Sequence, residues 1–347
     1  MTETKWYSGP IYVLVTLALV LGFSLVPATT SMVSAQGATG TFLTGNVPTV
    51  TIVYAPASVT PQTNMTVSVV VNNSDRNLTE LSNMTFQFWY DANGGNPSLG
   101  EFNASPNTAQ EGIGIPWDSV GGFGNLSPVN TTWVQLTCTA PADMNVTEGT
   151  FWFNFTIGKV AKKTSGLAVW QIAATANDTT YGMGFGYDAT PGVTMNFYSA
   201  VSISPPGPTV DWGLVPPGLA FAEDGNSEEA LGANVIYIVN GNYTQNVASS
   251  ANWTNLTAAN ATLDDTGTCG SAQQFSLKAD DTGTLPAGNL VTTGTGVAIK
   301  NGTITGDGTA GGGAGNVEAA NTLWLMLADT FATAEYTGTL TYSVAEV

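Results

Sequence analysis

Two copies of the pentapeptide Asp-Asp-Thr-Gly-Thr are the segments whose side chains best suit metal chemistry. The first copy begins with Asp264 and Asp265, and the second with Asp280 and Asp281. Adjacent carboxylates at loop ends supply the hard oxygen ligands that Ca²⁺ prefers, so the repeat predicts a weak calcium site. The same residues also suit a turn in which Asp accepts hydrogen bonds from its own backbone and Gly supplies positive φ. Of these two interpretations the pattern favours the turn.

Catalysis has little support in this composition. The chain has no histidine, which removes Ser-His-Asp and Cys-His catalysis and the usual general base near neutral pH. Paired carboxylates could hydrolyse glycosides, but the acids lie in polar turns without a surrounding motif. We therefore expect no catalytic residues and no enzyme activity.

The two cysteines, Cys138 and Cys269, are too few for a disulfide scaffold or a cysteine-based zinc site. In an oxidising compartment they could form one bond that closes a long loop. Their spacing does not decide whether they pair, because that depends on the distance between their α-carbons.

Acceptor tripeptides for N-linked sugar, Asn-x-Ser/Thr or sequons, are far more frequent than chance predicts. The chain has 28 Asn and 72 Ser or Thr among 347 residues, so random placement gives about six sequons. The excess predicts a glycosylated, extracellular surface, although a Thr- and Asn-rich β-protein also gathers sequons incidentally. The fifteen sequons start at Asn64, Asn72, Asn77, Asn83, Asn103, Asn125, Asn130, Asn145, Asn154, Asn177, Asn242, Asn252, Asn255, Asn260 and Asn301.

Three tryptophans, Trp89, Trp133 and Trp152, fall on the polar faces of predicted strands. Exposed indoles in a row would suit stacking on sugar rings or burial against a neighbouring subunit. The alternative is that another part of the same chain covers them.

The first 35 residues resemble a secretory signal, with Lys5 ahead of an apolar run from Ile11 to Val26 and small residues ending at Ala35. The run has 16 residues, fewer than the ~20 that span a bilayer, so we expect cleavage and no membrane span in the mature chain. The net charge is −18. Because no basic patch exists to neutralise phosphates, nucleic-acid binding is excluded.

Period-two alternation recurs along the chain, whereas helical periodicity is nearly absent. Apolar residues occupy every second position in 65–71, 84–90 and 151–157, which is typical of strands with one buried face. Turn residues separate these segments, so we predict an all-β chain of antiparallel sheets packed as sandwiches. In three strands the acceptor Asn falls on the solvent face.

The mature chain of about 312 residues is longer than a single hydrophobic core usually supports, which favours two domains in tandem. A proline-rich seam separates them, and the acidic excess is larger after it than before it. The predicted parts are a signal peptide at 1–35, Ig-like sandwiches at 36–203 and 219–347, and a linker at 204–218.

The C-terminal part carries a resemblance to a known class of surface modules. It contains Val210-Asp211-Trp212-Gly213-Leu214-Val215-Pro216-Pro217-Gly218, then a strand ending Asn240-Gly241-Asn242, and a Tyr-rich closing segment from Tyr336 to Tyr342. This pattern, over about residues 208–347, resembles the Ig-like or WxL-like modules on the surfaces of archaea and deep-branching bacteria. The resemblance implies a cell-surface role and no chemistry.

These observations together predict a secreted, N-glycosylated structural protein of the cell envelope, of the S-layer or surface-filament type. It would assemble with identical subunits or with other envelope proteins. An adhesive or carbohydrate-binding module is the alternative, and a secreted glycoside hydrolase is the third interpretation. No cofactor is expected other than Ca²⁺ at the acidic turns.

Overall fold

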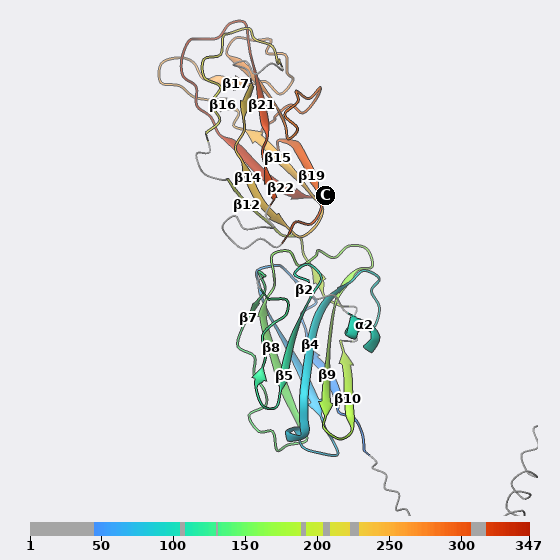
Figure 1. The fold of residues 1–347 in the computed structure, drawn as a ribbon. Coiled ribbons are helices and arrows are strands. Elements are labelled where there is room, and N and C mark those ends of the chain that lie inside the picture. Colours follow the sequence, from blue (N-terminus) through green and yellow to red (C-terminus); the bar gives the residue numbers. More distant parts are fainter. Residues whose placement is uncertain are drawn as a thin grey trace, which may run out of the picture. The chain divides into compact units, whose positions relative to one another are not determined.

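The structure is a computed structural model. It describes residues 45–104, 108–129, 131–188, 192–203, 209–222, 229–306 and 317–347, and of 317–319 it describes the backbone alone. The predicted signal peptide lies outside the described residues. Residues Gly45–Val347 form one compact unit, whose regular secondary structure is almost entirely strand, as predicted (Figure 1).

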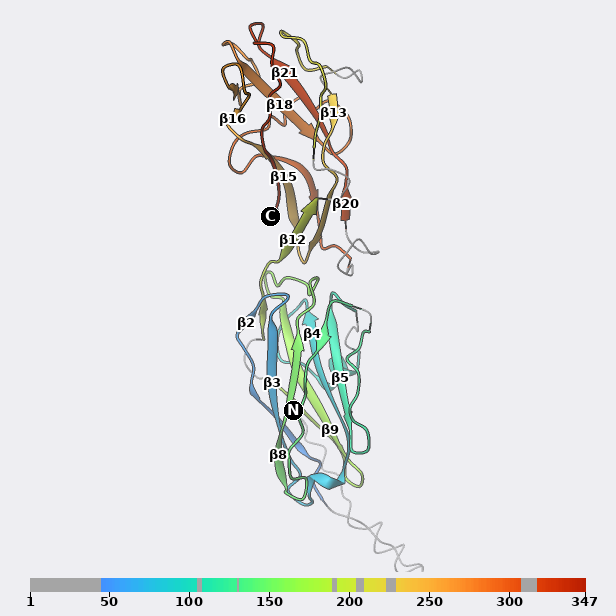
Figure 2. The same ribbon diagram turned by 90° about the vertical axis from the view of Figure 1, so that its left-hand side faces the viewer.

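Two sheets form the N-terminal sandwich (Figures 1 and 2). The first has the order β1-β3-β8-β7, with β1 (Thr49–Tyr54), β3 (Asn64–Asn72), β7 (Val134–Gln135) and β8 (Glu148–Thr156). The second has the order β10-β9-β4-β5-β6, with β4 (Leu81–Asp91), β5 (Gly112–Asp118), β6 (Gly122–Phe123), β9 (Val169–Asp178) and β10 (Gly182–Tyr187). Three short elements accompany them: β2 (Ser58–Val59), β11 (Thr194–Met195) and the 3-10 helix η1 (Leu78–Glu80).

The predicted alternation places the core between these sheets. Met65, Val67 and Val69 of β3 are at most 1% exposed, and the phenylalanines of β4 and β8 are equally buried, whereas Tyr90 near the end of β4 is half-buried. Phe86 of β4 stacks on Phe153 of β8 with ring centroids 4.7 Å apart. Burial of each such side chain contributes about 1.5–3 kcal/mol, so the inward residues hold the two sheets together.

Three sheets make up the C-terminal part. One has the order β13-β21-β18-β17-β16, with β13 (Glu229–Leu231), β16 (Asn252–Trp253), β17 (Ala261–Leu263), β18 (Gln274–Asp280) and β21 (Thr322–Leu327). A second has the order β19-β15-β22, with β15 (Tyr243–Ser249), β19 (Val297–Gly302) and β22 (Leu340–Glu346). The third has the order β12-β14-β20, with β12 (Ser199–Ile203), β14 (Val235–Val239) and β20 (Val317–Ala319).

The C-terminal core is assembled from several of these strands. Val247 of β15, Leu277 of β18 and Leu323 of β21 belong to one fully buried cluster. Trp212, in the predicted linker, packs against that cluster. Strand β12 falls inside the predicted N-terminal domain but pairs with β14.

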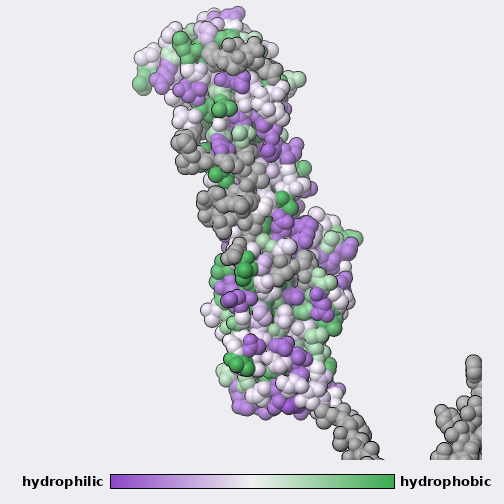
Figure 3. All heavy atoms as spheres, in the orientation of Figure 1, coloured by the Kyte–Doolittle hydropathy of each residue, from purple (hydrophilic) through white to green (hydrophobic). Residues whose placement is uncertain are grey.

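Almost all strand pairs are antiparallel; β2 with β11 and β17 with β18 are short parallel pairs. Within the described ranges, no helix has both the length and the apolar character required to cross a bilayer. On the face drawn in Figure 3, apolar side chains are scattered among polar ones.

Candidate functional surface

The described sequon asparagines all reach the protein surface. Asn130 lies outside the described residues, and none of the other fourteen is buried. Because an attached sugar must project into solvent, this distribution is compatible with glycosylation at every described acceptor. Ten are well exposed, namely Asn64, Asn77, Asn83, Asn103, Asn125, Asn145, Asn242, Asn252, Asn260 and Asn301.

Four sequon asparagines, Asn72, Asn154, Asn177 and Asn255, form a second class because they are only half-exposed. The Nδ2 atom that would carry sugar already donates a hydrogen bond in each of them. The acceptors are Glu148 Oε2 at 2.8 Å, Thr137 O at 2.6 Å, Ser82 Oγ at 3.1 Å and Ala259 O at 2.9 Å, in the same order. Of the described acceptors, these four are therefore the least favourable for glycan attachment, because they are only half-exposed and their nitrogen already takes part in a hydrogen bond.

None of the buried asparagines of the described part is a sequon acceptor. Asn73, Asn240 and Asn321 are at most 2% exposed. Each donates inside the protein; Asn240 Nδ2, for example, reaches the Ala161 carbonyl at 2.8 Å. Asparagine therefore has two separate roles here. The buried asparagines form hydrogen bonds inside the protein, whereas the described sequon acceptors all lie at the surface.

The first Asp-Asp-Thr-Gly-Thr copy folds as a closed turn after β17. Asp264 is 8% exposed, and its two carboxylate oxygens accept hydrogen bonds from the backbone N–H groups of Thr266, Thr268 and Cys269 at 2.6–3.1 Å. Gly267 has φ +75°. Burial raises the pKa of Asp264, but these hydrogen bonds and one from the Thr266 hydroxyl outweigh it and lower the pKa to about 2. The carboxylate is saturated by protein donors, so the turn interpretation describes this copy.

The second copy makes the same turn at the end of β18 with fewer donors. Asp280 accepts from the backbone N–H and the hydroxyl of Thr282, at 2.8 and 2.6 Å. Asp281 forms an ion pair with Lys300 at 3.1 Å, and Asp265 of the first copy is exposed. Among the described residues, no three His, Cys, Asp or Glu side chains gather closely enough to hold a metal ion.

Of the two interpretations left open for Trp89, cover by another part of the same chain is the one that the structure shows. Its side chain points to the outer face of β4, as the alternation requires, but it is only 4% exposed. Helix α2 (Leu99–Ala104) covers it, with Phe102 edge-on to the indole at 6.2 Å between centroids. A capping box holds this helix, since Ser98 and Glu101 exchange hydrogen bonds between side chain and backbone. That Ser-x-x-Glu signal was present in the sequence.

Trp133 is also buried, at 5% exposure, so the hypothesis of a row of three exposed indoles does not hold and the alternative of cover by the same chain applies to Trp133 as well. It precedes the two-residue strand β7, and its ring turns into the core beside Trp170, 5.8 Å away between centroids. Its Nε1 donates to the Ala109 carbonyl at 2.8 Å. A Cβ on Gly158 would lie 2.5 Å from the indole, so the ring needs glycine there. Only Trp152, at 40% exposure, faces solvent as predicted.

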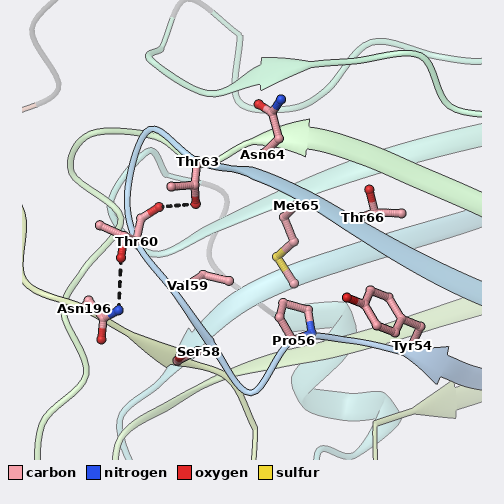
Figure 4. A pocket seen from close by; sticks show the side chains of 10 residues that line it. All are labelled: Tyr54, Pro56, Ser58, Val59, Thr60, Thr63, Asn64, Met65, Thr66 and Asn196. Atoms are coloured by element: carbon pink, nitrogen blue, oxygen red, sulfur yellow. Dashed lines mark hydrogen bonds between the residues drawn. The ribbon is translucent and has the colours of Figure 1, made fainter.

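An exposed tyrosine that the sequence analysis missed shares this face with Trp152. Tyr54 of β1 lies opposite Ser68 of β3, which in turn lies opposite Trp152 of β8. Tyr54 is 56% exposed. It also lines a shallow pocket with hydroxyl groups, where Thr60 accepts a hydrogen bond from Asn196 Nδ2 at 3.0 Å (Figure 4).

The two cysteines do not pair, which settles the alternative that the sequence left open. Both thiols are free. Cys138 packs against the N-terminal core and its Sγ approaches the backbone of Asn154, whereas Cys269 follows the Asp264 turn with its Sγ 3.7 Å from the Met326 carbonyl. Burial raises the pKa of both thiols.

No protein-family model matches this chain, and no curated protein is similar enough to be counted as a relative. The resemblance of residues 208–347 to Ig-like or WxL-like surface modules therefore stays a prediction.

Proposed function

We propose that this protein is a secreted, N-glycosylated structural component of the cell envelope, such as a subunit of an S-layer or surface filament. One observation carries the proposal: fifteen sequons occur where about six are expected, and none of the fourteen that the structure describes is buried. The secretory leader pattern and the net charge of −18 support an extracellular location.

The glycan part of the proposal is tested on protein isolated from its native cells. The mature chain should begin at Gln36, and its apparent mass on a gel should exceed the mass of the polypeptide. After chemical removal of the sugar, the apparent mass should fall to about that of the polypeptide. A native mass equal to that of the bare polypeptide would refute the glycoprotein.

The assembly part needs a separate experiment. Native protein should form large species in size-exclusion chromatography, because an envelope subunit must bind copies of itself. Elution as a monomer at every concentration, with and without Ca²⁺, would instead favour a binding module.

Carbohydrate binding is the second candidate, and the Tyr54–Trp152 face favours it. Two exposed aromatic rings lie on one sheet face on either side of Ser68, and hydroxyl groups line the pocket beside Tyr54. Aromatic rings stack on sugar faces while hydroxyls fix their orientation. Replacing both aromatics with Ser should abolish retention on a polysaccharide column and leave the melting curve unchanged; unchanged retention would remove this candidate.

A further inference from the structure

The sequons are not scattered independently over the strands, because two of them face each other across β3 and β8. In this antiparallel pair Asn64 lies opposite Thr156, and Thr66 lies opposite Asn154. The Thr66 hydroxyl donates to Asn154 Oδ1 at 2.7 Å, and the Thr156 hydroxyl donates to Asn64 Oδ1 at 2.8 Å. Each sequon therefore holds the amide oxygen of the other.

A one-sided form of this arrangement, with one threonine-to-asparagine hydrogen bond instead of two, recurs twice in the C-terminal sheets. Thr244 of β15 lies opposite Asn301 of β19 and donates to its Oδ1 at 2.8 Å. Thr262 of β17 lies opposite Asn252 of β16 and donates to its Oδ1 at 3.3 Å. Those threonines end the sequons of Asn242 and Asn260, so six of the fifteen sequons fall into three cross-strand pairs that are joined by a threonine-to-asparagine hydrogen bond.

This hydrogen bond has a consequence for the atom that carries sugar. A threonine that occupies Oδ1 fixes the amide orientation, because the last torsion of an Asn side chain is otherwise roughly two-fold. Nδ2 then lies on the other side of the amide. Within the described part it makes no protein hydrogen bond in Asn64, Asn252 or Asn301, whereas Asn154 Nδ2 donates to Thr137.

The position of two pairs in their sheets suggests what their sugars would do. Strands β16 and β19 are each outermost in the hydrogen-bonding order of their sheets. An outermost strand offers unpaired backbone groups to other chains, and proteins cover such edges to prevent unwanted pairing. Bulky glycans at Asn252 and Asn301 would cover these two edges.

We propose that the facing sequons are paired glycan-attachment sites, in which the threonine of one sequon positions the acceptor amide of the other. The β15/β19 and β16/β17 pairs carry two glycans each, of which those on Asn301 and Asn252 lie on edge strands. The β3/β8 pair carries one, on Asn64. This inference rests on the glycosylation in the proposed function and adds which sites are occupied and what positions them.

Glycopeptide mapping of the native protein by mass spectrometry tests the occupancy. Sugar is expected on Asn64, Asn242, Asn252, Asn260 and Asn301, with Asn154 bare. Glycans on loop sites such as Asn145 but none on the paired strands would overturn this inference and leave the proposed function standing. An absence of sugar at all fifteen sequons would refute both.

A matched pair of variants tests the role of the threonine. Asn242→Gln and Thr244→Val both destroy the Asn242 sequon, but only the second removes the hydroxyl that holds Asn301. Expressed in the native cells, Thr244→Val should lower occupancy at Asn301 by about half, because the freed amide turns its nitrogen inward part of the time. Asn242→Gln should leave Asn301 as in the parent protein. Equal occupancy at Asn301 in the two variants would overturn the positioning role. Circular dichroism on both confirms that the sheets are intact.

Discussion

The two Asp-Asp-Thr-Gly-Thr segments have one sequence and one backbone turn but different surroundings. In both, the first Asp accepts from its own backbone and the glycine has φ near +75°. Asp264 is buried and also receives the N–H groups of Thr268 and Cys269, whereas Asp280 is half-exposed. Local sequence thus determines the turn, and the tertiary environment determines how much the turn contributes to stability.

The largest expected effect comes from truncating the buried aspartate. Asp264→Ala leaves the buried N–H of Cys269 and the part-buried N–H of Thr268 without their acceptor, and an unsatisfied buried donor costs about 1–3 kcal/mol. We expect the free energy of unfolding in urea to fall by about 3 kcal/mol. The matched variant Asp280→Ala should cost about 1 kcal/mol because solvent can replace the lost carboxylate. Equal losses in the two variants would show that burial does not distinguish the turns.

The dependence of stability on acid pH provides a second test of the difference between the two turns. The pKa of Asp264 is about 2 in the folded protein, and that of an unfolded Asp is about 3.9. A carboxyl with a lowered folded pKa stabilises the protein fully above the unfolded pKa, and this contribution is lost as pH falls through the folded pKa. Between about pH 4 and pH 2, up to about 2 kcal/mol of stability should therefore disappear. Urea titrations of the parent, Asp264→Asn and Asp280→Asn at several pH values measure this loss of stability. If Asp264→Asn loses as much stability between pH 4 and pH 2 as the parent does, Asp264 is not the group responsible.

The sequence predicted the strands well because alternation depends on neighbours along the chain. It placed Met65, Phe86 and Phe153 inside, and they are fully buried. It put Trp89 on the correct face but could not show that helix α2 covers that face, because the covering segment comes from a separate element. The outward placement of Trp133 was wrong for another reason, because alternation predicts the direction of a side chain only within a regular strand and Trp133 precedes strand β7.

The facing sequons show which features cannot be predicted from alternation along the chain. Each Asn-x-Thr is visible in the sequence, and the outward direction of Asn64 and Asn154 follows from alternation. Which sequon lies opposite which depends on strand order and register, and these are set by the whole sheet. The Asp repeat is limited in the same way, because nothing in five identical residues tells a buried copy from an exposed one.

The second aspartate of each copy gives a smaller contrast. Asp281 pairs with Lys300 at 3.1 Å, with both side chains partly exposed, while Asp265 is exposed and has no ion pair within the described part. Asp281→Asn should lower the free energy of unfolding by about 0.5 kcal/mol, and the difference should shrink in about 1 M salt. Asp265→Asn is the control, with no loss expected. A loss that persists at high salt would mean that Asp281 acts through something other than charge.

Calcium should produce the smallest effect, because the carboxylate that is best placed to bind it is already occupied. The oxygens of Asp264 accept hydrogen bonds from three backbone N–H groups, and a cation would have to displace them. A site filled at a hundredfold excess over Kd would stabilise the protein by about 2.7 kcal/mol, which is several degrees in melting temperature. We expect a shift below about 1 °C between millimolar Ca²⁺ and chelator. A larger rise that Asp280→Ala abolishes and Asp264→Ala retains would assign calcium binding to the half-exposed copy, whose carboxylate accepts fewer hydrogen bonds.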